Sequence, residues 1–493
     1  MFKFTFIQTL MMVCGVLFAK AYEINGYALG FKGKIVYLER YEDYITFKKT
    51  IVAQAMVSEE GRFTINITPA DAYEAFLRID NNSGILYVDP ETSKLMVSFP
   101  PYDKIHEKVM RENRISLLFV DPDKDDLNTL ILEFNLRKDE FIYRTITKDT
   151  LTTFSKMEYS SPDFIKDLEA FKDSLYIYYK DIKKRFFIDY ITYSIAELEQ
   201  LSGMKDEDIT RAFLYNAYLK GVSPRYTYAG YMRFFNLYFN DFFKVPYFGP
   251  EEDIIDAINF HQSYQRSMLV LSRTKLLENK RVRELVLMKN MLSVFHQKSY
   301  SQEGIITILD SISMISPYEE NRFIAVQILK HLTKMLPGTP APRLKGIDVN
   351  TGQAFQASSI QDKYVYVMFY ATWCKPCMAE MDLIPDLKKK YGQYVEFVTV
   401  FIDLDEKETK DFLWNKRAYD WNFISIQGNP QVLDAYNVKS VPVYVLIDRE
   451  GMIENAPART PSPDGAYLTI DKDFFEIKKR LEPKREFKIG GKN

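Results

Sequence analysis

The sequence predicts a multidomain protein with an N-terminal all-β sandwich, an all-α middle and a C-terminal α/β part with a mixed central sheet. Three observations support this order. Short alternating apolar segments fill residues 22–120, helical periodicity fills 125–336, and strand and helix patterns alternate over 337–485. The chain has 493 residues, which is enough for roughly three domains of about 150 residues each.

Residues 1–21 are typical of an export signal. Lys3 supplies a weak positive charge, residues 10–19 are apolar, and Ala19-Lys20-Ala21 fits the small-x-small cleavage pattern. Because this apolar stretch is shorter than the about 20 residues of a membrane span, we expect cleavage and a mature chain that begins at Tyr22. Membrane attachment through an uncleaved signal is the alternative.

The composition excludes nucleic acid as a partner and limits the thiol chemistry. The 65 Lys and Arg residues against 67 Asp and Glu residues give a formal charge of −2, and no long basic tract is present. Only three cysteines occur, and Cys14 would be removed with the signal. An exported protein with two remaining, closely spaced cysteines does not use disulfides as a general scaffold, so we expect one reactive pair.

The first domain, residues 22–120, contains short strand-like segments separated by Asn, Asp, Gly and Pro turns. The predicted strands are 34–39, 50–57, 62–67, 76–79, 84–88 and 95–99. Short strands at this spacing favour an antiparallel sandwich.

The middle domain, residues 125–336, changes to helical spacing. The predicted helices are 163–178, 206–220, 229–243, 251–276, 281–298, 302–315 and 318–335. Residues 226–248 are dense in Tyr and Phe. We interpret this stretch as core packing, because aromatic side chains dominate core burial; a groove for a partner or an unfolded chain is the alternative.

A Pro- and Gly-rich segment, residues 337–342, is predicted to be a linker-like boundary before the third domain. Beyond it, strands and helices alternate. The predicted strands are 364–370, 395–402 and 443–447, and the predicted helices are 378–391, 406–417, 431–436 and 471–480. This order argues for an α/β layer with mixed strand directions.

Trp373-Cys374-Lys375-Pro376-Cys377 lies between a predicted strand and a predicted helix, a position typical of a thiol–disulfide redox centre. Cys374 would precede the first helical turn, where unpaired N–H groups and the helix dipole favour a thiolate. Lys375 adds positive charge, and Pro376 suits the first turn because it needs no N–H there. Cys377, one turn later, can attack the mixed disulfide formed by Cys374 and release the reduced partner.

Other uses of the cysteine pair fit the sequence less well. A zinc site needs four ligands, but no second cysteine pair exists and the four histidines lie before residue 337, so no metal is expected. A c-type haem site would need histidine after Cys377, where Met378 stands. A structural disulfide is the remaining alternative, but four-residue disulfide loops tend to be reducible.

Residues 337–480, about 30% of the chain, closely resemble the thioredoxin superfamily and specifically the TlpA/ResA-like envelope thiol–disulfide oxidoreductases. The matching residues are Gly338-Thr339-Pro340-Ala341-Pro342, Asp348-x-x-Thr351-Gly352, Phe369-Tyr370-Ala371-Thr372-Trp373-Cys374-Lys375-Pro376-Cys377, Glu380, Val441-Pro442 and Asp448-x-x-Gly451. Two departures are Tyr370, where thioredoxins usually carry tryptophan, and Asp382, where the family often has proline. With Pro385 further on, the kink of this helix is expected to be shifted or absent.

The resemblance implies a thioredoxin-like fold and dithiol–disulfide exchange without a cofactor. It implies that Cys374 is the exposed nucleophile, Cys377 the resolving cysteine and Pro442 a cis-proline. Trp373, Val441 and Pro442 are the expected substrate-binding residues, and Lys375 and Pro376 would tune the potential.

The resemblance implies that Glu380 is the acid–base group of the site. It would accept a proton from Cys377 or tune the cysteine pair through its charge, while a solvated helix glutamate is the alternative. The buried aspartate of cytoplasmic thioredoxins corresponds to Met368, which cannot titrate, and this leaves Glu380 as the candidate.

We therefore expect a periplasmic or cell-envelope enzyme that reduces protein disulfides and receives electrons from an upstream membrane or envelope donor. The first alternative is a disulfide oxidase or isomerase. The second is an envelope binding protein whose helical domain recognises partners and whose C-terminal domain is redox-regulated.

Overall fold

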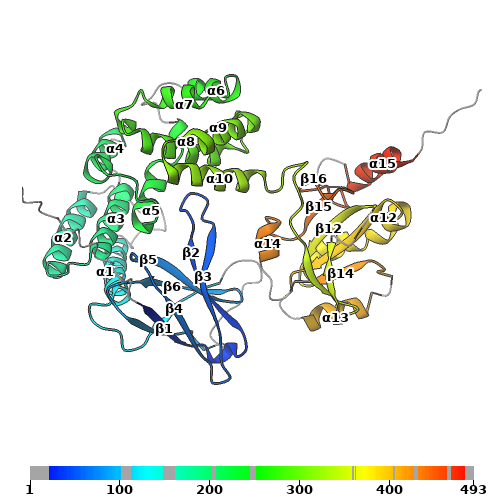
Figure 1. Ribbon diagram of the computed structural model, residues 1–493, viewed down its shortest axis with the longest axis horizontal. Helices are drawn as coiled ribbons and strands as arrows, with labels where there is room; N and C mark the ends of the chain where they lie inside the picture. The colour runs from blue at the N-terminus through cyan, green and yellow to red at the C-terminus, as the bar shows by residue number, and fades with distance from the viewer. Residues whose placement is uncertain are drawn as a thin grey trace, which may run out of the picture.

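The computed structural model describes residues 21–101, 113–147, 162–202, 207–244, 251–357, 360, 362–403, 406–416, 418–426, 431–463 and 468–482. A strand-rich N-terminal region, a helical middle and a C-terminal mixed sheet follow one another, which confirms the predicted fold class (Figure 1). The predicted export signal, with Cys14, lies outside the described residues except for Ala21. Within the described ranges, we find no helix with the length and apolar character that a bilayer crossing requires.

The N-terminal sandwich consists of one sheet in the order β4-β1-β7-β9 and a second in the order β3-β2-β5-β6-β8. The strands are β1 (Tyr22–Tyr27), β2 (Ile35–Tyr41), β3 (Lys49–Met56), β4 (Arg62–Ile67), β5 (Tyr73–Ile79), β6 (Asn82–Val88), β7 (Lys94–Ser98), β8 (Asn113–Ile115) and β9 (Leu118–Phe119). Ile24, Leu38, Leu86 and Val97 are among the side chains that fill the space between the sheets.

Most pairings in the sandwich are antiparallel, as predicted, but two pairings are parallel. β1 pairs in parallel with β7, and β6 pairs in parallel with β8. Parallel neighbours need a long connection, and each of these pairs is joined by a long stretch of chain rather than by a tight turn. Local alternation predicts that a strand exists but not which distant strand lies beside it.

The helical middle contains ten α-helices within the described residues. They are α1 (Leu127–Thr147), α2 (Pro162–Tyr179), α3 (Arg185–Ser202), α4 (Glu207–Leu214), α5 (Ala229–Tyr238), α6 (Glu251–Asn259), α7 (Tyr264–Leu271), α8 (Lys280–Val294), α9 (Gln302–Ile315) and α10 (Glu319–Thr333). The predicted helix 251–276 is in fact two helices, α6 and α7. Ser263 caps α7 by accepting a hydrogen bond from the Arg266 N–H at 3.2 Å, which begins a new helix there.

The described part of the aromatic-dense stretch, residues 226–244, lies mostly in the core of the helical middle, as predicted, and residues 245–248 lie outside the described residues. Phe234, Phe235 and Phe239 have no exposed surface. Tyr44 and Ile45, from the turn between β2 and β3, belong to the same apolar cluster. The sandwich and the helical middle therefore share a core, and burial of these rings argues against an open aromatic groove.

The C-terminal sheet has seven strands in the order β11-β10-β14-β13-β12-β15-β16. The strands are β10 (Lys345–Asp348), β11 (Ala354–Gln356), β12 (Tyr364–Tyr370), β13 (Val395–Phe401), β14 (Asn422–Ser425), β15 (Val443–Ile447) and β16 (Ile453–Asn455). The helices are α11 (Lys375–Met381), α12 (Ile384–Tyr391), α13 (Glu406–Trp414), α14 (Gln431–Ala435) and α15 (Ile470–Leu481). β12 lies inside the sheet between β13 and β15 and is fully buried; it runs parallel to β13 and antiparallel to β15.

The segment 337–342, which was predicted to be a linker-like boundary, is tied to the C-terminal sheet through its backbone. The Gly338 N–H donates to the Ile453 carbonyl at 2.7 Å, and the Ile453 N–H donates to the Thr339 carbonyl at 2.8 Å. Its backbone groups extend the sheet beside β16, which Gly and Pro content alone does not reveal.

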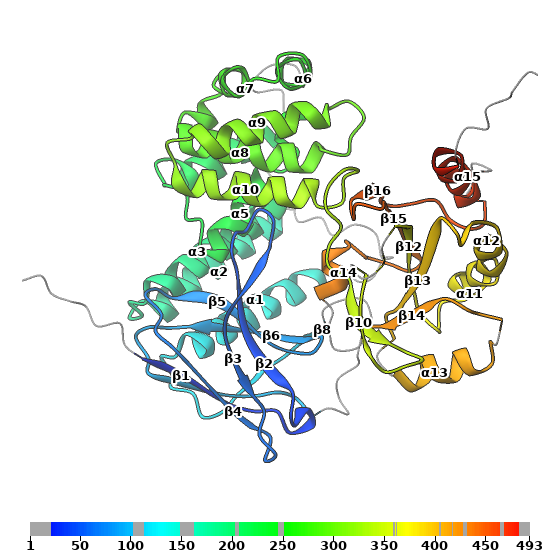
Figure 2. The ribbon, with the colours of Figure 1, turned by 45° about the vertical axis from the view of Figure 1, so that its right-hand side comes forward.

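A side chain of the helical middle also contacts the C-terminal part: Lys334 Nζ donates to the carbonyl of Asp434 in α14 at 2.5 Å. Figure 2 shows α14 on the side of the sheet that faces the rest of the chain, with α12 on the opposite side.

Candidate functional site

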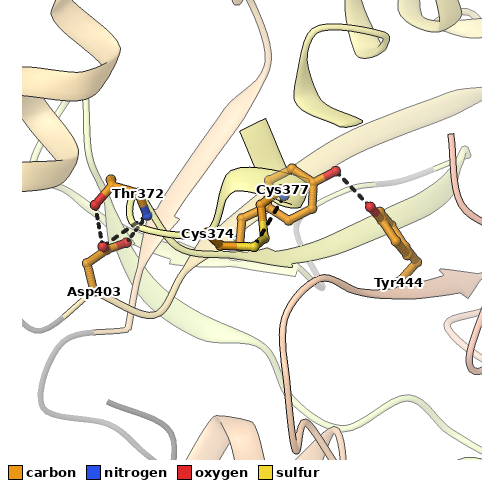
Figure 3. The surroundings of a disulfide bond; sticks show 6 residues. Thr372, Cys374, Cys377, Asp403 and Tyr444 are labelled. Atoms are coloured by element: carbon orange, nitrogen blue, oxygen red, sulfur yellow. Dashed lines mark hydrogen bonds between the residues drawn. A yellow bond between two sulfur atoms is a disulfide. The ribbon is translucent and has the colours of Figure 1, made fainter. Parts of the chain in front are cut away.

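The cysteine pair lies just beyond the C-terminal end of β12. β12 delivers a short loop, after which Cys374 caps the N-terminus of α11. Cys374 and Cys377 form a disulfide with their Cα atoms 5.2 Å apart, and Cys374 Sγ accepts a hydrogen bond from the Cys377 N–H at 3.2 Å (Figure 3). Pro376 stands in the first turn of α11, where its missing N–H leaves nothing unpaired. The structure thus places Cys374 just before the first helical turn, as the sequence predicted.

The two cysteines differ slightly in exposure. Cys374 is 5% exposed and Cys377 is 0% exposed. The expectation of an exposed nucleophile is therefore wrong for the disulfide form, because the fold covers most of Cys374 while the pair is closed. Trp373, directly before it, is 50% exposed, and Lys375 and Pro376 are exposed as well. A partner would therefore meet these three residues around the small accessible surface of Cys374.

Pro442 lies beside the cysteine loop. The Val441–Pro442 peptide bond is cis, as the resemblance implied, and both residues are half-buried. The register of β15 against β12 places Val443 opposite Phe369. Pro442 directly precedes β15, and the loop to Cys374 directly follows β12. Because β12 and β15 are antiparallel neighbours, the end of β12 and the start of β15 lie side by side, and so do these two loops.

Glu380 is half-buried, and the structure binds it to a residue that the sequence did not suggest. Its carboxylate accepts a hydrogen bond from the Ser462 N–H at 2.9 Å and another from the Ser462 hydroxyl. The two residues are 82 positions apart in the chain. The structure therefore does not leave Glu380 as a solvated helix residue, and Ser462 fixes the direction of its carboxylate.

Two tyrosines near Glu380 form a hydrogen-bonded pair that the sequence analysis did not predict. The Tyr370 and Tyr444 hydroxyl oxygens lie 3.1 Å apart in a buried hydrogen bond. Burial raises the pKa of both phenols, and the negative charge of Glu380 raises them further. The tyrosines therefore stay neutral. Tyr370 stands where thioredoxins usually carry tryptophan, and it supplies the hydroxyl group that forms the hydrogen bond with Tyr444.

Asp403 is a further buried group near the cysteine loop. Its carboxylate accepts hydrogen bonds from the Thr372 N–H and from the Thr372 hydroxyl (Figure 3). Burial raises the pKa of Asp403, and the hydrogen bonds from Thr372 oppose that rise. The only signal in the sequence is an aspartate directly after an apolar strand.

The helix after the cysteines bends, although the proline expected there is absent. α11 ends at Met381 and α12 begins at Ile384, with Pro385 in the first turn of α12. The Asp382 carboxylate at the break accepts hydrogen bonds from Lys416 Nζ at 3.0 Å and from the Tyr419 hydroxyl. The kink is therefore present at 382–383, where Pro385 starts the second helix.

In the part of the chain that the structure describes, no group of three or more His, Cys, Asp or Glu side chains could hold a metal ion.

Comparison with known proteins identifies the C-terminal part. A family model described as Thioredoxin-like matches residues 362–453. The thiol–disulfide oxidoreductase ResA of Bacillus cereus is 31% identical over 122 residues, which cover 24% of this chain and 68% of ResA. Through this part, the chain belongs to the thioredoxin-like thiol–disulfide oxidoreductases.

Other thioredoxin-like relatives match a similar share of the chain. The thioredoxin-like protein YneN of Bacillus subtilis is 31% identical over 121 residues, which cover 24% of this chain and 71% of YneN. A crystal structure of a putative thiol-disulfide oxidoreductase from Bacteroides vulgatus is 27% identical, covers 29% of this chain and 99% of that chain, and has a TM-score of 0.27. As a member of this family, the protein is an enzyme that exchanges thiols and disulfides, with protein thiols and disulfides as its substrates.

Proposed function

We propose that this thiol–disulfide oxidoreductase is exported and reduces protein disulfides through the Cys374–Cys377 couple. The observation that carries the proposal is the position of Cys374 at the N-terminus of α11, in a loop next to that of Pro442. The unpaired N–H groups of the first helical turn stabilise a thiolate there, and the thiolate is the attacking species in disulfide exchange.

In the proposed reaction, the Cys374 thiolate attacks one sulfur of a client disulfide. A Cys374–client disulfide forms, and the other client sulfur leaves as a thiolate that takes up a proton. Cys377 then loses its proton and attacks Cys374 Sγ, which releases the second client thiolate and closes the Cys374–Cys377 disulfide. The client gains two electrons, the protein loses two, and an upstream membrane or envelope dithiol donor restores the reduced pair.

The surrounding residues receive the remaining roles. We propose that Val441 offers its backbone to an extended client segment, that Pro442 shapes this loop and that exposed Trp373 packs on the client. Lys375 and Pro376 tune the potential of the pair from the first turn of α11. Glu380 accepts the proton that Cys377 loses.

The proton-accepting role of Glu380 predicts graded effects on the second step. Glu380→Gln is expected to slow release of the client from the mixed disulfide by about a hundredfold, because general base catalysis is lost. Ser462→Ala keeps the carboxylate but removes its hydroxyl donor, so we expect a slowing of about threefold. Stopped-flow fluorescence of a client peptide measures this step. Glu408→Gln, an exposed glutamate on α13, is the control; if it slowed release as much as Glu380→Gln, the role would be refuted.

Equilibration with glutathione tests the direction of the reaction. A reductant should have a potential below about −230 mV, close to the about −270 mV of thioredoxin, because its clients must be the stronger oxidants. Quenched samples, alkylated and resolved by mass spectrometry, give the ratio of reduced to oxidised protein. A value near the about −120 mV of DsbA would instead favour the disulfide oxidase or isomerase.

Export rests on the signal-like residues 1–21 alone. We propose cleavage after Ala21 and a periplasmic or cell-envelope location, with an uncleaved membrane anchor as the alternative. N-terminal sequencing of the protein recovered from the envelope separates these, since the first gives Tyr22 and the second gives residues upstream of it. We also propose the domain limits 22–120, 125–336 and 337–485.

A second candidate function has an observation of its own. An open cavity of about 560 Å³ lies between the sandwich and the helical middle, and Lys184, Phe186, Arg225 and Tyr226 line part of it. This volume is within the about 300–1,000 Å³ range of ligand sites. We propose as this second candidate an envelope binding protein whose helical domain, which supplies these four lining residues, recognises partners and whose C-terminal domain is redox-regulated. Retention of clients by a variant that cannot form mixed disulfides would support this candidate.

A further inference from the structure

A buried carboxylate holds the loop that carries the reactive cysteine. Asp403 is 2% exposed and follows β13. Its Oδ1 and Oδ2 atoms lie 3.0 and 3.1 Å from Thr372 N, and Oδ1 lies 2.6 Å from Thr372 Oγ1. Thr372 is two residues before Cys374, so this contact acts next to the site of exchange.

The end of the β12–β13 ladder explains why a carboxylate is needed there. The parallel pairing ends with Tyr370 opposite Phe401, and the Ile402 N–H still donates to the Tyr370 carbonyl at 3.0 Å. Beyond this point the segments that follow β12 and β13 separate, and the Thr372 N–H has no partner in β13. The Asp403 side chain reaches back and satisfies both donors of Thr372.

The hydrogen bonds of the Asp403 carboxylate are concentrated on one residue, Thr372. Among the described residues, its side-chain hydrogen bonds to other residues all go to Thr372, and the ion pairs do not include it. A buried carboxylate without a cation costs free energy unless its hydrogen bonds are satisfied. Figure 3 shows the carboxylate directed at Thr372 from the side away from the disulfide. It therefore acts on the cysteines through the loop rather than by contact with sulfur.

We propose that Asp403 is a positioning residue for disulfide exchange: by anchoring Thr372, it holds Cys374 Sγ at the N-terminus of α11. The inference rests on the proposed role of Cys374 as the nucleophile. When the anchor is lost, the loop shifts, the thiolate loses part of its contact with the helical N–H groups, and the attacking sulfur is misplaced. Misplacement of a reacting atom by about 1 Å is enough to slow a reaction severely.

Three substitutions in the full-length protein test this role. Asp403→Asn keeps the shape and one acceptor oxygen, but it removes the charge and replaces Oδ2, which lies 3.1 Å from Thr372 N, with an amide donor. Thr372→Val removes the hydroxyl and keeps the N–H, and Thr372→Ser keeps both donors. We expect reduction of a model disulfide peptide to slow about tenfold in Asp403→Asn and about threefold in Thr372→Val, with Thr372→Ser close to the parent. The double variant should be no slower than Asp403→Asn, because both changes break one contact.

The pH profile of alkylation distinguishes positioning from simple stability. In a Cys377→Ser background, iodoacetamide labelling of the Cys374 peptide is followed by mass spectrometry as a function of pH. We expect its midpoint to move to higher pH in Asp403→Asn and, by less, in Thr372→Val, and to stay unchanged in Thr372→Ser. Thermal unfolding by circular dichroism verifies that each variant is folded, and Thr372→Val serves if Asp403→Asn does not fold.

An unchanged midpoint and rate in the folded variants would overturn the role of Asp403. If Cys374 of the parent protein itself reacted like an ordinary free cysteine, the proposed function would fail instead, so the two failures are distinguishable.

Discussion

Cys377→Ser is expected to accumulate client proteins joined to Cys374 by a disulfide, whereas Cys374→Ser should capture none. Without Cys377, the mixed disulfide has no neighbouring thiol to resolve it. Without Cys374, the attacking sulfur is lost, and the remaining cysteine is 0% exposed in the closed pair. We expect insulin reduction to fall by about a thousandfold or more in Cys374→Ser, because the nucleophilic sulfur is lost while serine can still cap α11.

Non-reducing gels of envelope fractions, followed by mass spectrometry of the trapped complexes, measure this outcome. The two serine variants are matched controls, since each removes one sulfur from the same disulfide. Equal capture by both variants would contradict the order of attack. Clients retained by Cys374→Ser without a disulfide would point to recognition outside the redox site and favour the binding-protein candidate.

Phe235→Ala is expected to destabilise the helical middle by about 4 kcal/mol, since it removes a fully buried ring from a core. The Phe235 ring lies 4.8 Å from that of Phe239 and 6.0 Å from that of Tyr231, measured between centroids. The cavity left behind cannot collapse easily between these rings. Urea unfolding followed by circular dichroism measures the loss.

Leu237→Ala on the same helix is the matched control, because Leu237 is 42% exposed. It should change stability by no more than about 0.5 kcal/mol. Cys374 belongs to a separate apolar cluster, so its alkylation rate should be unchanged in folded Phe235→Ala. Equal destabilisation by both variants would mean that the aromatic stretch is not a core.

The redox centre could be recognised from the sequence because its chemistry is local. Cys374, Lys375, Pro376 and Cys377 occupy one helical turn, and a proline in that position marks the start of a helix. The fold class could be recognised for a related reason, since the period of apolar residues reports strands and helices directly. The density of aromatic residues in 226–248 predicts a core for a similar reason, because aromatic rings dominate core burial.

The partners of these residues could not be found in the same way. Asp403 is 31 positions from Thr372, and it reaches Thr372 only because β12 and β13 pair in parallel. Ser462 is 82 positions from Glu380, in a chain segment beyond the last strand of the sheet. A serine in a loop has no pattern that distinguishes it from surface residues, and the position of Asp403 directly after an apolar strand does not reveal that its partner is Thr372.

The amino-acid sequence alone predicts two closely spaced cysteines at the start of a helix and three regions that differ in secondary structure: one of strands, one of helices and one of both. It also shows no basic tract that would bind nucleic acid. Strand pairing, the attachment of 337–342 to the sheet and the anchors of Thr372 and Glu380 emerged only on folding. The physical reason is range. Helix caps and periodicity are set within a few residues, whereas hydrogen bonds to a buried carboxylate depend on which distant strand lies alongside.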